Sequence, residues 1–146
     1  MPKPAPIKVR CVTYKDEFSA DRCAYNDLLI GVKHKTVGCG SKVFNASKTG
    51  DLVIITGNLG KVRFFTIGAL ADRLEGCDLW AAEGGRVWDY NFTYEPLTGV
   101  HEVTAEVEAL IEASCKKHEV DPRYVMHSRF CGERYEPVLR DLVAQL

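Results

Sequence analysis

Two extended apolar runs on either side of a turn dominate the middle of this chain, Thr49–Leu74. Leu52–Ile55 is an unbroken apolar run that is too short for a buried helix, and Lys61–Leu70 is rich in β-branched and aromatic residues. The intervening segment, Thr56–Gly60, consists mostly of turn-forming residues, so the stretch predicts a β-hairpin. The first strand is apolar on both faces, and something must therefore cover both of its sides. This places the hairpin in the middle of a closed or well-covered sheet.

The segments before the hairpin carry both strand and helix signals. Ile7–Tyr14 alternates apolar with polar residues and predicts a half-buried strand. Ser19 is a good N-cap for a helix that ends by Gly31, and a flexible bend, Gly38–Ser41, follows it. For the next residues, Lys42–Ser47, periodicity does not decide between a short helix and a loop.

The segments after the hairpin complete an α+β pattern. Arg86–Pro96 has an aromatic residue at every second position from Trp88 and predicts a strand that ends at the proline. Val103–His118 is the clearest helix, because its apolar residues recur on one face and its last turn is basic. Glu136–Leu146 predicts a second, terminal helix.

The charge balance limits the kind of partner that the chain can take. It has 19 Lys and Arg residues against 20 Asp and Glu residues, which gives a net charge of -1 at pH 7. A protein that is held to nucleic acid by charge alone shows a clear basic excess. Any nucleic-acid contact is therefore expected at a local patch or pocket. With 146 residues, the chain is expected to form a single domain, 1–146.

The cysteines and the N-terminus indicate a reducing compartment. The six cysteines are scattered and none stands in a C-x-x-C pair, which argues against a zinc ribbon or a thioredoxin-like centre. Residues 1–6 lack the apolar core of a signal peptide, and no apolar run approaches the ~20 residues that span a bilayer. We therefore expect a soluble, cytoplasmic protein with free thiols and no membrane contact.

Aromatic residues are the first candidates for a binding site. Trp88, Tyr90, Phe92 and Tyr94 alternate along one predicted strand, and Trp80 lies nearby in the sequence. Aromatic rings are good stacking platforms for a flat base. The alternative is that they fill one face of a sheet as core, as aromatic residues commonly do. Because two tryptophans stand so close to a glycine-rich loop, we expect one of them to line a pocket.

Basic residues between two glycine bends are the second candidates. Lys33, His34 and Lys35 follow Gly31, and Lys42 comes after the next bend. Such a group can grip a phosphate. The alternative is a solvated loop, the usual structure of a charged run. His34 has no obvious nucleophile partner in the sequence, so no catalytic residue is predicted.

Motifs for metals and nucleotide cofactors are missing from the sequence. The spacings of His127 with Cys131 and of Cys115 with His118 fit one helical face, but neither pair completes a four-ligand site. The chain contains no P-loop, no G-x-G-x-x-G and no G-x-S-x-G. Neither a metal nor a cofactor is expected.

Taken together, the segments of residues 7–100 resemble the PUA-like superfamily, nearest to its EVE and YTH-type members. That pattern runs through a strand, a helix, a G-V-[RK] turn, a short segment with an aromatic residue, G-D-L-V, and a strand with G-x-A. The matching segments are Val9–Thr13, the helix after Ser19, Gly31–Lys33, Ser41–Asn45, Gly50–Val53, Ile67–Ala69 and Trp88–Leu97. The chain lacks the tryptophans that the EVE pattern has in the first strand and just before Gly31. The resemblance does not explain a helical C-terminal extension, 101–146.

The resemblance implies a small mixed β-barrel flanked by helices, with the C-terminal helices packed alongside. It also implies a cleft between the barrel and the loop before Gly50, in which relatives hold a flipped, often modified base between aromatic walls. A nucleic-acid-binding module of this kind is our leading prediction. The residues assigned to the base are Trp80, Trp88, Tyr90, Ser41 and Asn45, and those assigned to the phosphates are Lys33 and Lys42.

Two other functions stay open. One is a hydrolase of the related ASCH type that acts on RNA or a modified nucleoside, with Lys33 or Lys42 opposite Asp51 or Glu83. The G-x-K-x-x-E-x-R signature of that group is absent, which places a hydrolase second. The other is a nucleotide-sequestering or protein-interaction factor that forms a homodimer through its C-terminal helices.

Overall fold

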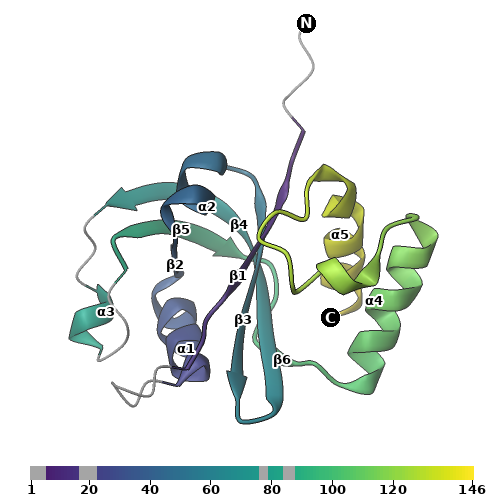
Figure 1. The fold of residues 1–146 in the computed structure, drawn as a ribbon, viewed down its shortest axis with the longest axis horizontal. Coiled ribbons are helices and arrows are strands. Elements are labelled where there is room, and N and C mark those ends of the chain that lie inside the picture. Colours follow the sequence, from purple (N-terminus) through teal and green to yellow (C-terminus); the bar gives the residue numbers. More distant parts are fainter. Residues whose placement is uncertain (1–5, 17–22, 76–78, 84–87) are drawn as a thin grey trace, which may run out of the picture.

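The computed structural model describes residues 6–16, 23–75, 79–83 and 88–146. It is an α+β fold with six strands in one mixed sheet, ordered β1-β3-β4-β5-β2, with β6 paired to β4 (Figure 1). The strands are β1 (Val9–Thr13), β2 (Thr36–Cys39), β3 (Leu52–Leu59), β4 (Val62–Glu75), β5 (Tyr90–Pro96) and β6 (His101–Glu102). The helices are α1 (Ala24–His34), α2 (Ser41–Ala46), α3 (Leu79–Ala82), α4 (Ala105–Lys117) and α5 (Glu136–Gln145), with the 3-10 turns η2 (Pro122–Tyr124) and η3 (Glu133–Tyr135). The sheet is open, because no ladder joins β1 to β2 among the described strands.

Strand β3 lies inside the sheet with apolar layers on both of its faces. Leu52 and Ile54 pack into a core cluster with residues of α4 and α5, whereas Val53 and Ile55 pack into a second cluster with residues of α1 and α2. All four side chains are between 0% and 2% exposed. Figure 1 shows α4 and α5 to one side of β3 and α1 and α2 to the other. The prediction that both faces of this strand are covered is confirmed.

Strands β3 and β4 form the predicted hairpin, but its turn lies further along the chain than expected. β3 continues to Leu59, so Gly60 and Lys61 make the turn. Gly57 was expected in the turn and lies within the strand instead. A Cβ atom at Gly57 would lie 2.6 Å from the Ala24 carbonyl oxygen, so this glycine lets α1 begin close to the sheet.

Helix α1 runs past its predicted end at Gly31. It continues to His34, and Lys35 closes it with a left-handed φ of 52°. The predicted N-cap, Ser19, lies outside the described residues. A Cβ atom at Gly31 would lie 2.6 Å from the Thr36 carbonyl oxygen. Glycine is therefore used at this position for close packing, and the helix prediction was wrong about where it ends.

The segment Gly38–Ser41, predicted as a flexible bend, contains the end of β2 and the start of α2. Cys39 pairs with Tyr90 in a regular antiparallel register with β5. The next residues, which periodicity left undecided, belong mainly to the short helix α2.

Strand β1 is more deeply buried than its alternating sequence predicts. It pairs with β3 in parallel on one edge, and residues 129–132 cover the other edge. The Val9 N–H donates to the Gly132 carbonyl, and the Cys11 N–H to the Arg129 carbonyl, both at 3.3 Å. The C-terminal extension thus pairs with an edge strand that would otherwise expose its backbone groups.

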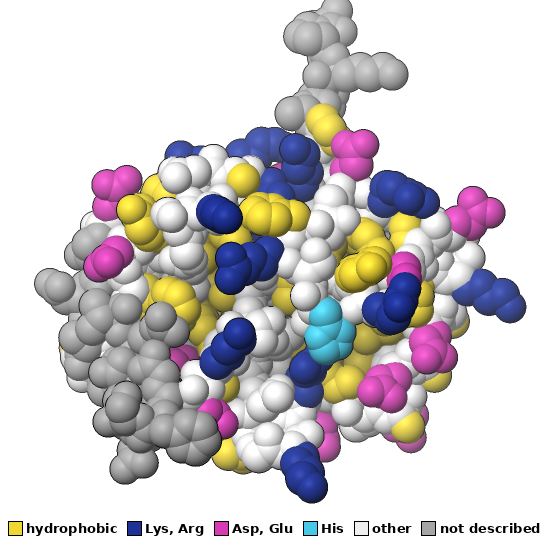
Figure 2. All heavy atoms as spheres, in the orientation of Figure 1, with side chains coloured by type: hydrophobic (Ala, Val, Ile, Leu, Met, Phe, Trp, Pro, Cys, Tyr) yellow, Lys and Arg dark blue, Asp and Glu magenta, His cyan; other side chains and the backbone are white. Residues whose placement is uncertain are grey.

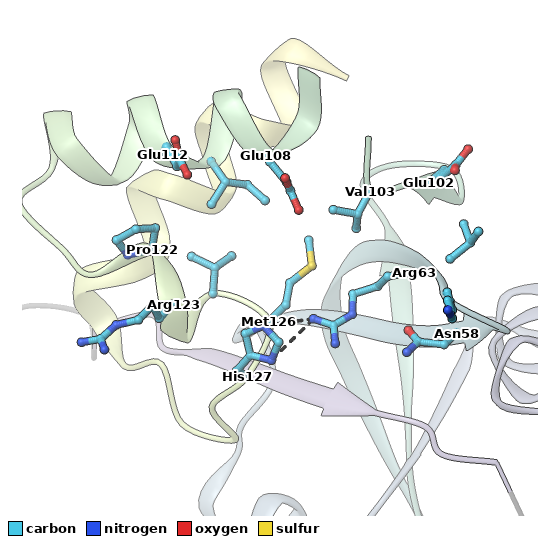
Figure 3. A pocket seen from close by; sticks show the side chains of 14 residues that line it. Asn58, Arg63, Glu102, Val103, Glu108, Glu112, Pro122, Arg123, Met126 and His127 are labelled. Carbon is cyan, nitrogen blue, oxygen red and sulfur yellow. Dashed lines mark hydrogen bonds between the residues drawn. The ribbon is translucent and has the colours of Figure 1, made fainter. Parts of the chain in front are cut away.

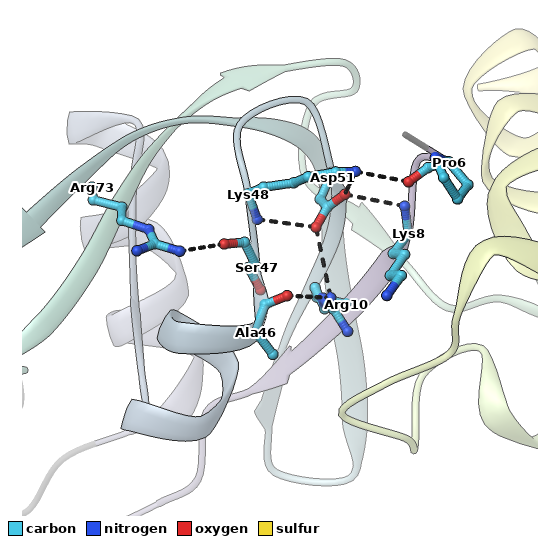
Figure 4. A network of polar contacts seen from close by, with 8 residues as sticks. All are labelled: Pro6, Lys8, Arg10, Ala46, Ser47, Lys48, Asp51 and Arg73. Atoms are coloured by element: carbon cyan, nitrogen blue, oxygen red, sulfur yellow. Dashed lines mark hydrogen bonds and ion pairs between the residues drawn. The ribbon is translucent and has the colours of Figure 1, made fainter. Parts of the chain in front are cut away.

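The polar residue in the middle of β1, Arg10, is only 4% exposed because it belongs to a buried network (Figure 4). Its Nη2 donates to the Ala46 carbonyl at 2.6 Å and lies 3.7 Å from Asp51 Oδ2. Asp51 is 0% exposed and also accepts from the backbone N–H groups of Lys8 and Lys48, each at 3.1 Å. The Asp of the G-D-L-V motif is therefore a structural clamp between β1, the loop before β3 and β3 itself.

The C-terminal extension covers one face of the sheet. Helix α4 forms within the predicted segment Val103–His118, and Thr104 caps it by accepting from the Val107 N–H. Helix α5 is joined to α4 through Asp141, whose Oδ2 accepts from Ser114 Oγ at 2.7 Å and lies 2.9 Å from His118 Nε2. Within the described ranges, no helix is both long and apolar enough to cross a bilayer.

Candidate functional site

A cleft lies where the two end strands of the sheet, β1 and β2, separate. Across this seam, the Gly38 N–H donates to the Tyr14 hydroxyl at 3.1 Å. The cleft has a volume of about 670 Å³. Its lining residues come from β1 and the segment after it, the end of β2, the start of α2 and the loop after η2, with one tryptophan: Cys11, Val12, Thr13, Lys15, Cys39, Gly40, Ser41, Lys42, Val43, Trp88, Met126, His127, Ser128 and Arg129.

Trp88 is the aromatic wall of this cleft, and Gly38 is the reason that it fits. A Cβ atom at Gly38 would lie 2.2 Å from Cγ of the Trp88 indole. Only glycine therefore lets the indole lie directly against β2. The ring also packs on Tyr14, with ring centroids 5.5 Å apart. The indole is partly buried, so packing fixes its position while part of it faces the cleft.

The charged side chains that line this cleft are all basic. Lys15, Lys42 and Arg129 contribute to its wall, and no Asp or Glu residue is among the lining residues. Figure 2 shows dark-blue basic side chains on both sides of a histidine in the middle of this face of the molecule. A chain with a net charge of -1 thus places three basic side chains beside a partly buried aromatic ring. The field of these basic side chains attracts anions, and the nearby low-dielectric walls strengthen it.

His127 lies at the edge of the cleft, where the Arg63 guanidinium contacts its ring. Arg63 Nη1 lies 3.1 Å from His127 Nε2, which orients the imidazole. Since a guanidinium only donates, this nitrogen of the ring is the acceptor. His127 and its neighbour Met126 also line a second cleft on the other side of the loop.

The structure brings three of the predicted site residues together. Trp88, Ser41 and Lys42 all line the cleft at the seam. They come from two segments that are more than forty positions apart in the sequence.

Trp80 and Asn45 lie elsewhere. Trp80 is 0% exposed, and its Nε1 donates to Asn91 Oδ1 at 2.7 Å, so it belongs to the core and offers no face to a ligand. Asn45 is exposed on α2 and is not among the residues that line the cleft.

Tyr90 and Lys33 are also outside the cleft lining. Tyr90 is 36% exposed and packs against Phe44, with ring centroids 5.1 Å apart. Lys33 pairs with Glu83 at 2.9 Å, and His34 Nε2 lies 2.9 Å from the same carboxylate oxygen. The hydrogen bond from His34, followed by that from Lys33, lowers the pKa of Glu83.

The sequence did not predict Lys15 or Arg129 as site residues, and His127 was considered only as a metal ligand, on a helical face shared with Cys131 that the structure does not form. Lys15 comes directly after the predicted first strand. A basic residue at the end of a strand is a weak indication of a binding site, and the sequence did contain it. His127 and Arg129 lie in an irregular segment between η2 and η3 that has no period or motif. Only the pairing of residues 129–132 with β1 brings them to the cleft.

The two cysteines that line this cleft are buried. Burial raises the pKa of the Cys11 thiol to about 11 and that of Cys39 to about 12, so both thiols are protonated at neutral pH and are poor nucleophiles. The described cysteines are free thiols, as expected, and Cys77 lies outside the described residues. No group of three His, Cys, Asp or Glu side chains within the described ranges is placed to hold a metal ion.

Comparison with known protein families, with curated proteins and with solved structures finds no significant match to this chain. The residues that line the cleft are therefore the basis for a functional proposal.

Proposed function

We propose that this protein is a nucleic-acid-binding module that holds one base, with its phosphate, in the cleft beside Trp88. The observation that carries the proposal is the meeting of an indole, a hydroxyl and three basic side chains in one hollow: Trp88, Ser41, Lys42, Lys15 and Arg129. On this proposal the sheet is an open, PUA-like arrangement of strands, and the seam between β1 and β2 is the binding site. A nucleotide is an anion with a flat aromatic part, which is the chemistry that this lining matches.

The lining supplies enough interaction for a specific but moderate affinity. Stacking of one base on an aromatic side chain stabilises a complex by about 1–3 kcal/mol. The Ser41 hydroxyl both donates and accepts, and it can meet the polar edge of a base. The cleft volume of about 670 Å³ lies within the common range for small-molecule sites.

The near-neutral charge of the whole chain predicts a weak dependence on salt. If Lys15, Lys42 and Arg129 together hold the one phosphate of the bound base, the slope of log K against log salt for a single strand is about -0.7. A groove binder with many phosphate contacts has a much steeper slope. The slope therefore separates a pocket from an extended basic track.

The indole N–H signals in a ¹⁵N NMR spectrum test the proposal directly, because the chain has two tryptophans, one buried in the core and one at the cleft. The protein is titrated with each nucleoside 5′-monophosphate and with short single-stranded RNA and DNA of mixed sequence. We expect the Trp88 signal to shift on titration while the Trp80 signal stays in place. No shift of the Trp88 signal with any of these ligands contradicts the proposal.

Variants assign the interaction to the cleft. Trp88→Ala is expected to weaken binding about 5- to 150-fold, the equivalent of one stacked base, and Trp88→Phe to restore part of the loss. Lys42→Ala should weaken binding several-fold and flatten the salt dependence. Lys116→Ala, an exposed lysine on α4 that does not line the cleft, is its matched control. Equal effects of Lys42→Ala and Lys116→Ala would mean that the cleft is not the site.

A further inference from the structure

A second cleft of about 640 Å³ adjoins the first, and Met126 and His127 line both (Figure 3). It lies between the β3–β4 hairpin and helix α4. The extension supplies the α4 side of this cleft and the shared loop, and residues 7–100 supply the hairpin side, so the second cleft lies where the two parts of the chain meet.

Charged side chains of both signs line the second cleft. Lys61 and Arg63 lie on the hairpin side with Glu102 of β6, and Glu108 and Glu112 of α4 lie on the other side with Arg123 of η2. Among the ion pairs of the described residues, none joins Arg63 to Glu108. Figure 3 shows the Glu108 carboxylate and the Arg63 guanidinium on opposite sides of the Met126 side chain. Glu108 thus offers an acceptor and Arg63 offers donors on either side of an apolar side chain, Met126.

We propose that the second cleft holds the neighbouring nucleotide of a single strand, and that Glu108 selects a base with amino donors, with guanine as the best match. The proposal rests on the function proposed above and names the substrate: a strand of at least two nucleotides instead of a free mononucleotide. Met126 and His127 form the shared boundary, so two adjacent nucleotides can lie on either side of it without leaving the protein surface.

The Glu108 carboxylate determines which base fits. An ionised carboxylate is an acceptor only. Guanine presents N1–H and N2–H₂ side by side, so it can donate two parallel hydrogen bonds to one carboxylate. Cytosine and adenine offer one amino group each, and a carboxylate is a known acceptor for the cytosine amine. Uracil and thymine present a single N–H between two carbonyl oxygens, which the carboxylate repels.

Arg63 and Met126 suit the rest of the nucleotide. Arg63 is oriented by His127, at 3.1 Å from Nη1 to Nε2, and its remaining N–H groups are available to a phosphate. Met126 is 5% exposed, and a thioether makes favourable contacts with the edge of an aromatic ring. A phosphate on Arg63 and a base edge on Glu108 would place the flat base over this sulfur.

The experiment compares mononucleotides with dinucleotides by calorimetry and by the Trp88 indole signal. The probes are the nucleoside 5′-monophosphate that binds best in the first titration and the 5′-phosphorylated dinucleotides that add guanine, cytosine, adenine or uracil on either side of it. We expect added guanine to strengthen binding about tenfold, as one good bidentate contact does, and added uracil to strengthen it little.

Glu108→Gln tests the selectivity, because the amide keeps the size of the side chain and can both donate and accept. It should remove the preference for guanine over uracil while leaving binding of the mononucleotide unchanged. Glu106→Gln, an exposed glutamate on the same helix that does not line the cleft, should preserve the preference. Arg63→Ala should remove the gain from any second nucleotide.

The outcomes separate this inference from the function on which it depends. If mononucleotides bind at Trp88 but a second nucleotide adds nothing, the second cleft is not part of the site and the inference fails while the function stands. A gain that is equal for guanine and uracil, or that survives Glu108→Gln with its preference intact, overturns the role of Glu108. If no nucleotide shifts the Trp88 signal, both proposals fail together.

Discussion

The two parts of this chain are held together in different ways. Residues 7–100 form the sheet, where backbone ladders join β1, β3, β4, β5 and β2 into one layer. Residues 101–146 contribute only β6 and an isolated bridge to that sheet, and are held mainly by side chains. Yet Leu139 and Leu142 of α5 lie in the same core cluster as Leu52 and Ile54 of β3. The extension therefore completes the core of the sheet, and it also supplies one wall of the Trp88 cleft.

Removing the carboxylate of Asp51 is expected to have the largest effect on the sheet part. Asp51→Ala leaves the buried Arg10 guanidinium without its carboxylate, and loss of one partner of a buried pair costs about 3–5 kcal/mol. Urea denaturation of this variant and of Asp72→Ala, an exposed control, measures the difference. A loss below about 1 kcal/mol would show that the Ala46 carbonyl alone satisfies Arg10.

Shortening a buried side chain in each part tests whether the two parts unfold together. Leu139 of α5 is 0% exposed and Leu28 of α1 is 1% exposed, one in each core cluster. Leu139→Ala and Leu28→Ala are each expected to lower the free energy of unfolding by about 2–5 kcal/mol. Because the clusters share β3, tryptophan fluorescence, which reports on the sheet part alone, should follow the same transition as circular dichroism.

Leu29→Ala is the matched control for this pair, since Leu29 adjoins Leu28 and is 39% exposed. It should change stability little. If Leu139→Ala produces an early transition in circular dichroism that tryptophan fluorescence does not detect, the extension folds separately and the shared core does not couple the two parts.

A smaller effect is expected at the junction of α4 with α5. Asp141→Asn replaces a charged acceptor of Ser114 and His118 and should cost about 1 kcal/mol near neutral pH. Hydrogen bonds from Ser114 and then from His118 lower the pKa of Asp141 below its ordinary value of 3.8. Because the pKa is lowered in the folded state, the ionised carboxylate stabilises that state at pH values above its ordinary pKa. This stabilisation is lost as the pH falls through the folded-state pKa.

The difference in stability between the wild type and Asp141→Asn should therefore be present at pH 7 and shrink as the pH falls below about 4. Denaturation over a pH series measures it. A difference that grows on acidification would contradict the role of the ionised carboxylate.

The smallest effect is expected at the surface pair of the sheet part. Lys33 and Glu83 lie 2.9 Å apart, but the lysine side chain is 64% exposed. Solvent and salt screen such a pair, so Glu83→Gln should leave the melting temperature within experimental error. A clear drop in the melting temperature would mean that the contact between Lys33 and Glu83 stabilises the fold more than its exposure indicates.

Several elements of the fold could be predicted from the sequence because their signals are local. The apolar run Leu52–Ile55 required cover on both faces, and the spacing of apolar residues in Val103–His118 required a helix with one buried face. Both predictions rest on the spacing of apolar side chains along the chain, which does not depend on distant residues. The positions of Trp88, Ser41 and Lys42 near one another were predicted from a resemblance to a known superfamily.

The tertiary structure decided how the glycines and the two tryptophans are used. Gly31 and Gly38 were expected to end a helix and to make a bend, but they give room to Thr36 and to the Trp88 indole. Close approach between segments leaves no local pattern, so the sequence could not distinguish it from a turn. For the same reason, the sequence did not separate the sealed Trp80 from Trp88 at the cleft. Arg129 reaches this cleft because residues 129–132 pair with β1, a contact between the two ends of the chain that no local period encodes.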